Sequence, residues 1–139
     1  MSAIRGAASY GRGASAYARV GVESGVMSAS PHQLIVMLFD GGLAAIRAAR
    51  IHMEAGNTAE KGRSISKALD IVNNGLAAAL DTEKGGEVAE RLGSLYDYIA
   101  RLLLAANLHN DQQSLSQAES LLENVASAWR EIGGSAGHE

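Results

Sequence analysis

Apolar side chains recur every three or four residues from residue 31 onward, the spacing that places them on one face of an α-helix. Short polar or glycine-containing stretches interrupt this pattern three times. The pattern predicts four helices, at about 31–55, 58–80, 86–108 and 112–132.

Helix starts and stops fall between these segments. Ser30, Pro31 and Gln33 match a capping box with proline at the first helical position, where its missing N–H has no cost. We expect residues 81–86 to form a polar loop, and the Gly133-Gly134 pair to end the last helix.

Short connections make consecutive helices antiparallel neighbours, so residues 31–133 are predicted to form an all-α, up-down four-helix bundle. Residues 134–139 should fray. Residues 1–19 are rich in small residues without a helical or strand period, which indicates a disordered, flexible arm. Residues 20–30 are more apolar, and we expect them to cap the bundle as an extended segment or a short extra helix.

Two predicted helices carry more apolar surface than a four-helix bundle can bury. In the first helix, Val36, Leu43 and Ile51 lie in the sector that also holds charged residues. In the third helix, Leu104 and Leu108 do the same. Either the chain's own residues 20–30 cover this surplus, or it forms a groove that accepts an amphipathic helix of a partner. The two alternatives are compatible if a partner displaces residues 20–30 when it binds.

Two adjacent glycines, Gly41 and Gly42, interrupt the first helix at a cost of about 1 kcal/mol each relative to alanine. We expect a neighbouring helix, or a side chain such as Trp129, to approach closely there.

Composition narrows the function. The chain of 139 residues is 47% hydrophobic but only 4% aromatic and has no cysteine, which favours packed helices and excludes disulfides and thiolate-bound zinc. Residues 1–30 carry a net charge of +2 and residues 31–139 a net charge of −5. This charge distribution is unfavourable for binding nucleic acid. No run approaches the ~20 apolar residues of a membrane span, so no direct membrane insertion is expected.

Residues that could carry catalysis do not occur in productive patterns. The four histidines are never three or four residues apart, so helical metal-ligand pairs are missing. His32 and His109 are expected to be solvated. Phosphate-binding glycine loops and activated serines are missing as well. We therefore predict no enzyme activity, no cofactor and no metal.

Several blocks of this sequence resemble one known family, the flagellar secretion chaperones called FliS. They occur in the family's order and spacing, from about Tyr17 to Ile132. The blocks are residues 20–24, residues 28–41, Lys61-Gly62 with residues 65–69, and residues 80–87, 95–99 and 106–111.

The resemblance implies a cytoplasmic antiparallel bundle that binds the disordered C-terminal segment of flagellin. Such a chaperone prevents premature polymerisation and delivers the subunit to the cytoplasmic domain of the flagellar type III export gate. In the family an N-terminal segment caps an apolar groove, and a tyrosine there, matched by Tyr17, docks to the gate. Whether the chain forms a homodimer stays open.

These considerations assign two sets of binding residues. The predicted flagellin groove consists of Val36, Leu43, Ile51, Ile71, Leu104 and Leu108. The predicted N-terminal cap and export-gate contact consists of Tyr17, Val20, Val22 and Met27.

Two alternatives belong to other classes. One is a generic helical adaptor or structural bundle. The other is a nucleic-acid-associated helical protein that uses Arg5, Arg12 and Arg19, for which steeply salt-dependent DNA binding would be the sign.

Overall fold

The structure, a computed structural model, describes residues 29–136, with side chains through Gly133. The predicted cap and gate residues Tyr17, Val20, Val22 and Met27 lie outside this range. The described chain is helical and contains no strand. Its elements are α2 (Pro31–Glu54), α3 (Thr58–Asp70), η1 (Ile71–Leu76), η2 (Ala77–Ala79), α4 (Thr82–His109) and α5 (Gln112–Ala136).

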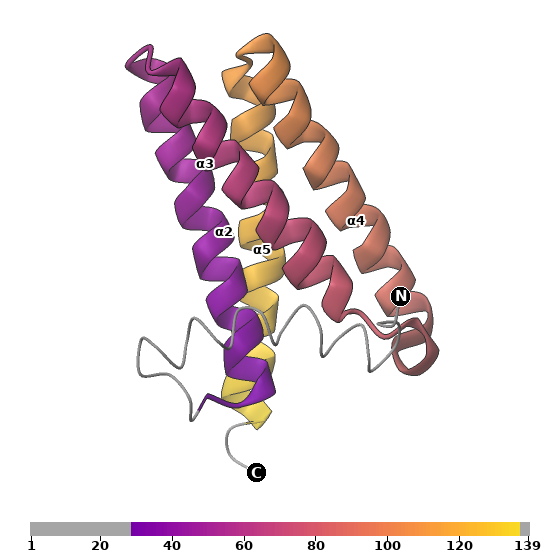
Figure 1. Ribbon diagram of the computed structural model, residues 1–139. Coiled ribbons are helices and arrows are strands. Elements are labelled where there is room, and N and C mark those ends of the chain that lie inside the picture. Colours follow the sequence, from indigo (N-terminus) through magenta and orange to yellow (C-terminus); the bar gives the residue numbers. More distant parts are fainter. Residues whose placement is uncertain (1–28, 137–139) are drawn as a thin grey trace.

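The four helices run alternately up and down, so the predicted antiparallel four-helix bundle is confirmed (Figure 1). Helix α2 packs against α3 and α5, and α4 packs against α5 and α3. Two of these four interfaces, α2 with α5 and α3 with α4, are called the α2–α5 and α3–α4 seams.

The start of α2 follows the sequence prediction. The Ser30 side chain accepts a hydrogen bond from the Gln33 backbone N–H at 3.1 Å, and the Gln33 side chain accepts one from the Ser30 N–H at 2.8 Å. Pro31 occupies the first turn, where no N–H partner is needed.

The second predicted helix is less regular than its apolar spacing suggests. After Asp70 the chain forms a π-helical turn, Ile71–Leu76, and then a 3₁₀ turn, Ala77–Ala79. A π turn is wider than an α turn. Here Ile71, Val72, Gly75 and Leu76 are all buried.

The expected loop over residues 81–86 is wrong in part. Helix α4 already begins at Thr82, because the Asp81 side chain accepts hydrogen bonds from the N–H groups of Glu83 and Lys84 at 3.1 and 3.2 Å. A break follows at Gly86, whose φ of 54° and ψ of −129° suit a residue without Cβ.

Helix α5 continues to Ala136, so the prediction that Gly133-Gly134 ends it is wrong. Gly133 has a packing role instead. A Cβ at that position would lie 1.9 Å from the His32 ring, so only glycine leaves room for the ring.

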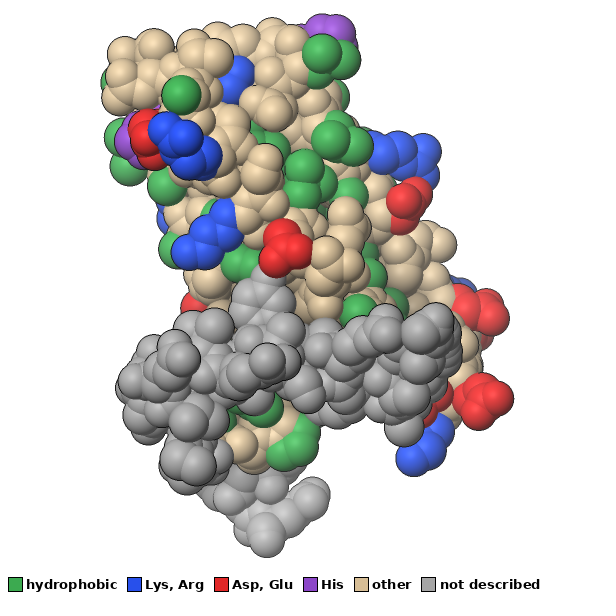
Figure 2. Space-filling model, viewed as in Figure 1, with side chains coloured by type: hydrophobic (Ala, Val, Ile, Leu, Met, Phe, Trp, Pro, Cys, Tyr) green, Lys and Arg blue, Asp and Glu red, His purple; other side chains and the backbone are tan. Residues whose placement is uncertain are grey.

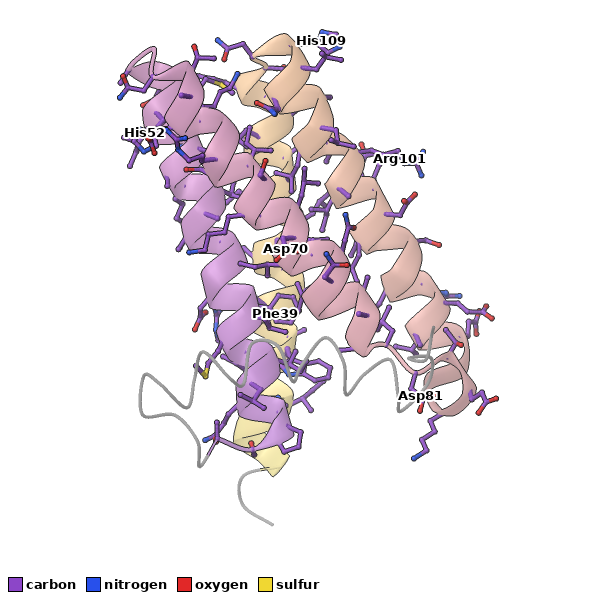
Figure 3. All side chains as sticks on the ribbon, in the orientation of Figure 1. Phe39, His52, Asp70, Asp81, Arg101 and His109 are labelled. Carbon is purple, nitrogen blue, oxygen red and sulfur yellow. The ribbon has the colours of Figure 1, made fainter. Side chains whose placement is uncertain are left out.

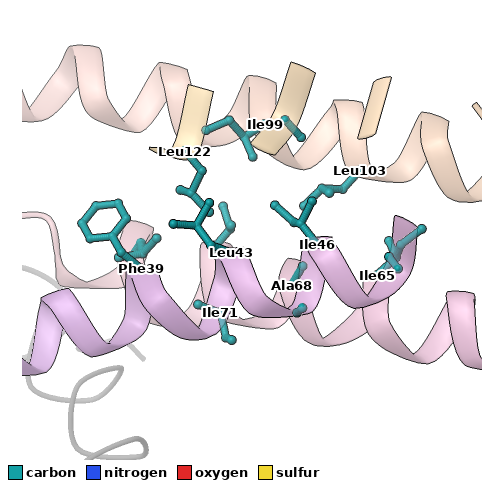
Figure 4. Packing of buried hydrophobic residues seen from close by; sticks show 14 of the residues in the cluster. Phe39, Leu43, Ile46, Ile65, Ala68, Ile71, Ile99, Leu103 and Leu122 are labelled. Atoms are coloured by element: carbon teal, nitrogen blue, oxygen red, sulfur yellow. The ribbon is translucent and has the colours of Figure 1, made fainter. Parts of the chain in front are cut away.

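The core runs the length of the bundle and draws on every helix (Figure 4). Leu43 and Ile71 belong to it, packed among Phe39, Ile46 and Leu122. The expectation that Leu43 lies off the core is therefore wrong.

The expected close approach at Gly41-Gly42 is confirmed, although Trp129 does not make it. A Cβ on Gly42 would lie 3.2 Å from Leu122 of α5 and 3.5 Å from Ile71, and one on Gly41 would lie 3.4 Å from Ile71. These glycines let Ile71 and Leu122 pack tightly against α2.

Candidate functional site: an apolar groove and an end cavity

Two exposed leucines of α4 lie toward its C-terminal end. Leu104 is 54% exposed and Leu108 is 78% exposed. One turn separates them, so they share a face of the helix. Water-exposed leucines in adjacent turns are the kind of surface that a partner covers.

This face of α4 is turned toward α3. Gly93 lies three helical turns before Leu104 and so points the same way. A Cβ on Gly93 would contact Leu80, at the end of the α3 segment, at 3.6 Å. The Asn107 side chain likewise approaches Gly62 of α3. The surface between α3 and α4, bearing Leu104 and Leu108, is called the α3–α4 groove below.

Hydrophobic side chains are visible along this groove, with charged groups toward its edges (Figure 2). Leu69 of α3 is only half-buried and packs against the core. On α4 one charged pair, Arg101 with Asp97 at 2.5 Å, is itself exposed.

The structure divides the six predicted groove residues among three places. Leu104 and Leu108 lie on the α3–α4 groove. Val36 shares a face of α2 with Arg47, and Ile51 shares one with Asp40, because three turns separate the members of each pair. Both charged residues pair with α5, so Val36 and Ile51 belong to the other seam.

Leu43 and Ile71 are buried. A partner cannot reach either side chain while the bundle is closed. Of the six predicted residues, Leu104 and Leu108 are therefore the two that lie on the α3–α4 groove, whereas Ile51 is exposed beside the α2–α5 seam.

Ion pairs close the α2–α5 seam. Arg47 contacts Glu119 at 2.8 Å and Glu123 at 3.3 Å, and Arg50 also pairs with Glu119. Arg130 of α5 reaches back to Asp40 at 2.6 Å. Burial raises the pKa of Glu119, but hydrogen bonds and charge from Arg50 and Arg47 outweigh burial and hold it below the usual value. Paired charges cover much of this seam, and the 62% exposed side chain of Ile51 lies beside them.

Besides these ion pairs, a stack of two aromatic rings joins α2 and α5 near the start of α2. The His32 and Trp129 rings lie 5.1 Å apart with planes only 4° from parallel. His32 Nε2 is 2.7 Å from the Trp129 carbonyl oxygen, and Trp129 Nε1 donates to the His32 carbonyl at 3.4 Å. The expectation that His32 is solvated is wrong, because its ring packs between Trp129 and Gly133.

An apolar cavity of about 220 Å³ opens beside this stack, at the end of the bundle where α2 and α4 begin. Its walls come from α2, η1, η2, α4 and α5 and from Leu80 before α4. They include Ile35, Leu76, Leu92 and Tyr96. Burial raises the pKa of Tyr96 well above its usual range, so the hydroxyl keeps its proton. This set is called the end cavity.

The opposite end of the bundle contains a more polar cleft of about 320 Å³ between the end of α2, the start of α3 and the end of α4. Lys61, only 5% exposed, lies in its wall. The Lys61 ammonium donates to the Asn107 carbonyl at 3.2 Å and to the Asn110 side chain at 3.0 Å. Its place is structural: it ties α3 to the left-handed C-cap of α4.

Side chains that could support other chemistry are scattered. His52 and His109, at this same end, lie on different helices (Figure 3). The described residues contain no group of three or more histidine and carboxylate side chains able to hold a metal ion. No helix in the described range has the length and apolar character needed to cross a bilayer.

The end cavity was not predicted from the sequence. Leu92, Tyr96 and Leu103 share a helical period, so the burial of Tyr96 could have been foreseen. The cavity itself is formed where four helix ends diverge, and no single helix's periodicity contains that information.

An all-helical bundle with an exposed apolar groove belongs to the class of folds that can accept an amphipathic segment of another protein. The family model described as "Flagellar protein FliS" matches residues 13–136. The chain therefore belongs to the FliS family of flagellar secretion chaperones, and the resemblance noted in the sequence is confirmed.

Relatives across the family agree with this assignment. The chain is 57% identical over 120 residues to the flagellar secretion chaperone FliS of Salmonella typhimurium strain LT2, covering 86% of this chain and 89% of the relative. Identity to the FliS of Escherichia coli strain K12 is 48%, with 86% and 88% covered. Identity to the FliS of Bacillus subtilis strain 168 is 28% over 109 residues, with 78% and 80% covered.

Proposed function

We propose that this chain is a cytoplasmic export chaperone that binds the disordered C-terminal segment of flagellin, prevents its premature polymerisation and delivers it to the flagellar type III export apparatus. Membership of a flagellar secretion chaperone family supports an export role. The single observation that carries client binding is the exposure of Leu104 and Leu108 on the α3–α4 groove.

An apolar groove suits a client that is disordered before it binds. Ordering such a segment typically costs about 2–5 kcal/mol of the gross interaction energy, so the docking surface must return apolar burial over several side chains. Leu104 and Leu108, in adjacent turns of one helix, contribute that burial, while ion pairs cover much of the α2–α5 seam.

The test is binding of a peptide that spans the flagellin C-terminal segment, measured by calorimetry with the full-length chain. Replacing both Leu104 and Leu108 with serine should weaken binding about a hundredfold or more, since each buried leucine contributes about 1.5–3 kcal/mol. Because both side chains are exposed, the melting temperature should fall only slightly.

Val88→Ser is the matched control: Val88 is also an exposed aliphatic residue of α4 but lies near its other end. It should leave peptide affinity unchanged. Equal affinity of the double variant and the wild type would contradict the proposed groove, and a severe loss of stability would place the two leucines in the core.

Residues 20–30 are proposed to cap the apolar surface of the free chaperone, with Val20, Val22 and Met27 as its apolar contacts. The support is their apolar but unperiodic sequence, which directly precedes Pro31. Deleting residues 1–24 should leave the helical content unchanged and increase binding of the dye ANS. Unchanged dye binding would show that this segment covers nothing apolar.

Tyr17 is proposed to contact the cytoplasmic domain of the export gate once the client is bound. A tyrosine combines a large apolar ring with a polar tip, which suits a half-buried contact. Tyr17→Ala should preserve stability and client affinity within a few-fold but weaken gate binding about ten- to a hundredfold. Wild-type gate binding by the mutant complex would exclude this role.

A further inference from the structure

The end cavity contains one polar group that the described residues leave unsatisfied. Tyr96 is only 4% exposed and lines the cavity, yet its hydroxyl has no hydrogen-bond partner among the residues that the structure describes. The ring is held in place against Phe39, with centroids 6.5 Å apart. Buried hydroxyls are nearly always paired, so an orphan in a cavity wall points to a ligand.

A second tyrosine on the same helix provides the contrast. Tyr98 is partly exposed, and its hydroxyl accepts a hydrogen bond from the Gln117 side chain at 3.2 Å. The unpaired hydroxyl therefore belongs to the tyrosine that is buried and lines the cavity.

Other polar groups in the cavity wall are already occupied. The His32 ring and the Trp129 indole each bond the other's backbone carbonyl, as described above. The remaining walls named above are aliphatic. An occupant must therefore be apolar apart from one group that can pair with a hydroxyl, which both donates and accepts.

The size of the cavity fits a large side chain. An apolar cavity of about 150 Å³ is enough to hold benzene, and this one has about 220 Å³. A peptide that is disordered before binding supplies the polar group as well, because backbone N–H and C=O groups at the ends of any helix it forms have no internal partner.

We propose that the end cavity is a receptor for one large apolar side chain of the bound client segment, and that the Tyr96 hydroxyl pairs with a backbone group beside that side chain. Tyr96 is thus a specificity-determining residue that reads the client's backbone at a fixed place. The inference rests on the proposed function, since the occupant is the client.

Tyr96→Phe in the full-length chain isolates the hydroxyl and keeps the ring. The free variant should melt at the wild-type temperature or higher, because removing an unpaired buried hydroxyl removes a desolvation cost. Its affinity for the flagellin C-terminal peptide should fall about five- to tenfold, the value of one hydrogen bond. An unchanged or higher melting temperature together with a lower peptide affinity is the result expected of a hydroxyl that pairs with a ligand.

Two further variants complete the test. Ala79→Leu narrows the cavity and should weaken peptide binding with the fold retained, whereas Tyr98→Phe, the matched control, should leave affinity unchanged. A Tyr96→Phe variant that binds the peptide as wild type does would overturn the inference and leave the proposed function standing.

A lower melting temperature of Tyr96→Phe would also overturn the inference, because the hydroxyl would then serve the chain's own fold. A wild-type chain that does not bind the peptide at all would overturn both the proposed function and this inference.

Discussion

The α2–α5 and α3–α4 seams of the bundle are held together by different kinds of interaction. Across α2–α5, Arg47 and Arg50 pair with Glu119, and His32 stacks on Trp129. Across α3–α4, no ion pair joins the described side chains of the two helices, and leucines remain exposed. The α2–α5 seam is closed by ion pairs and a ring stack, with Ile51 exposed beside them, whereas the α3–α4 seam leaves two leucines of adjacent turns exposed. We therefore place the proposed client site on the exposed leucines of the α3–α4 seam.

The largest expected contrast is between a leucine buried beneath the seams and one on the groove. Leu43→Ala should lower the free energy of unfolding by about 2–5 kcal/mol, because it leaves a cavity in a packed core. Leu104→Ala, at an exposed site, should change it by about 0.5 kcal/mol or less. Urea denaturation of both variants checks this, and equal losses would contradict the separation of core from groove.

The next effect concerns the stack that fixes the end of the α2–α5 seam. His32→Ala should cost about 1–2 kcal/mol, since it removes a stacked ring and a hydrogen bond. Gly133→Ala should destabilise the wild type, because its Cβ would displace the His32 ring.

In the His32→Ala background the same glycine substitution should stabilise the chain by up to about 1 kcal/mol through helix propensity. A double-mutant cycle measures this change of sign. Additive effects of the two substitutions would show that the ring does not pack on Gly133.

The smallest effect is electrostatic. Glu119→Gln should cost about 1 kcal/mol at pH 7, as expected for a carboxylate shared by two arginines near the surface. The pKa of Glu119 is lowered in the folded state, so its contribution is present above the unfolded pKa of about 4.3 and is lost as the pH falls through the folded value.

The stability difference between wild type and Glu119→Gln should therefore close on acidification. Denaturation at pH 7 and at about pH 3 measures it. A difference that persists at the lower pH would mean that the carboxylate charge is not what holds this seam.

Local signals in the sequence predicted much of the fold. The capping box at Ser30 set the start of α2, and three- and four-residue spacing with short connections set the antiparallel order. These features depend on neighbouring residues in the chain, so one sequence is enough to recognise them.

The candidate site was predicted only in part, for a physical reason. Helical periodicity shows that Leu43 and Leu104 both depart from the main stripe, but only packing decides that the first is buried and the second is exposed. The π turn at Ile71–Leu76 and the end cavity likewise arise from contacts between distant segments.

The most direct measurement is amide chemical-shift mapping of the full-length chain as the flagellin C-terminal peptide is added. We predict that the largest changes fall on the α3–α4 groove, around Leu69, Leu104 and Leu108, with little change at Arg47 and Glu119 on the α2–α5 seam. Changes concentrated on the α2–α5 seam, with the α3–α4 groove unperturbed, would contradict the assignment of the client site.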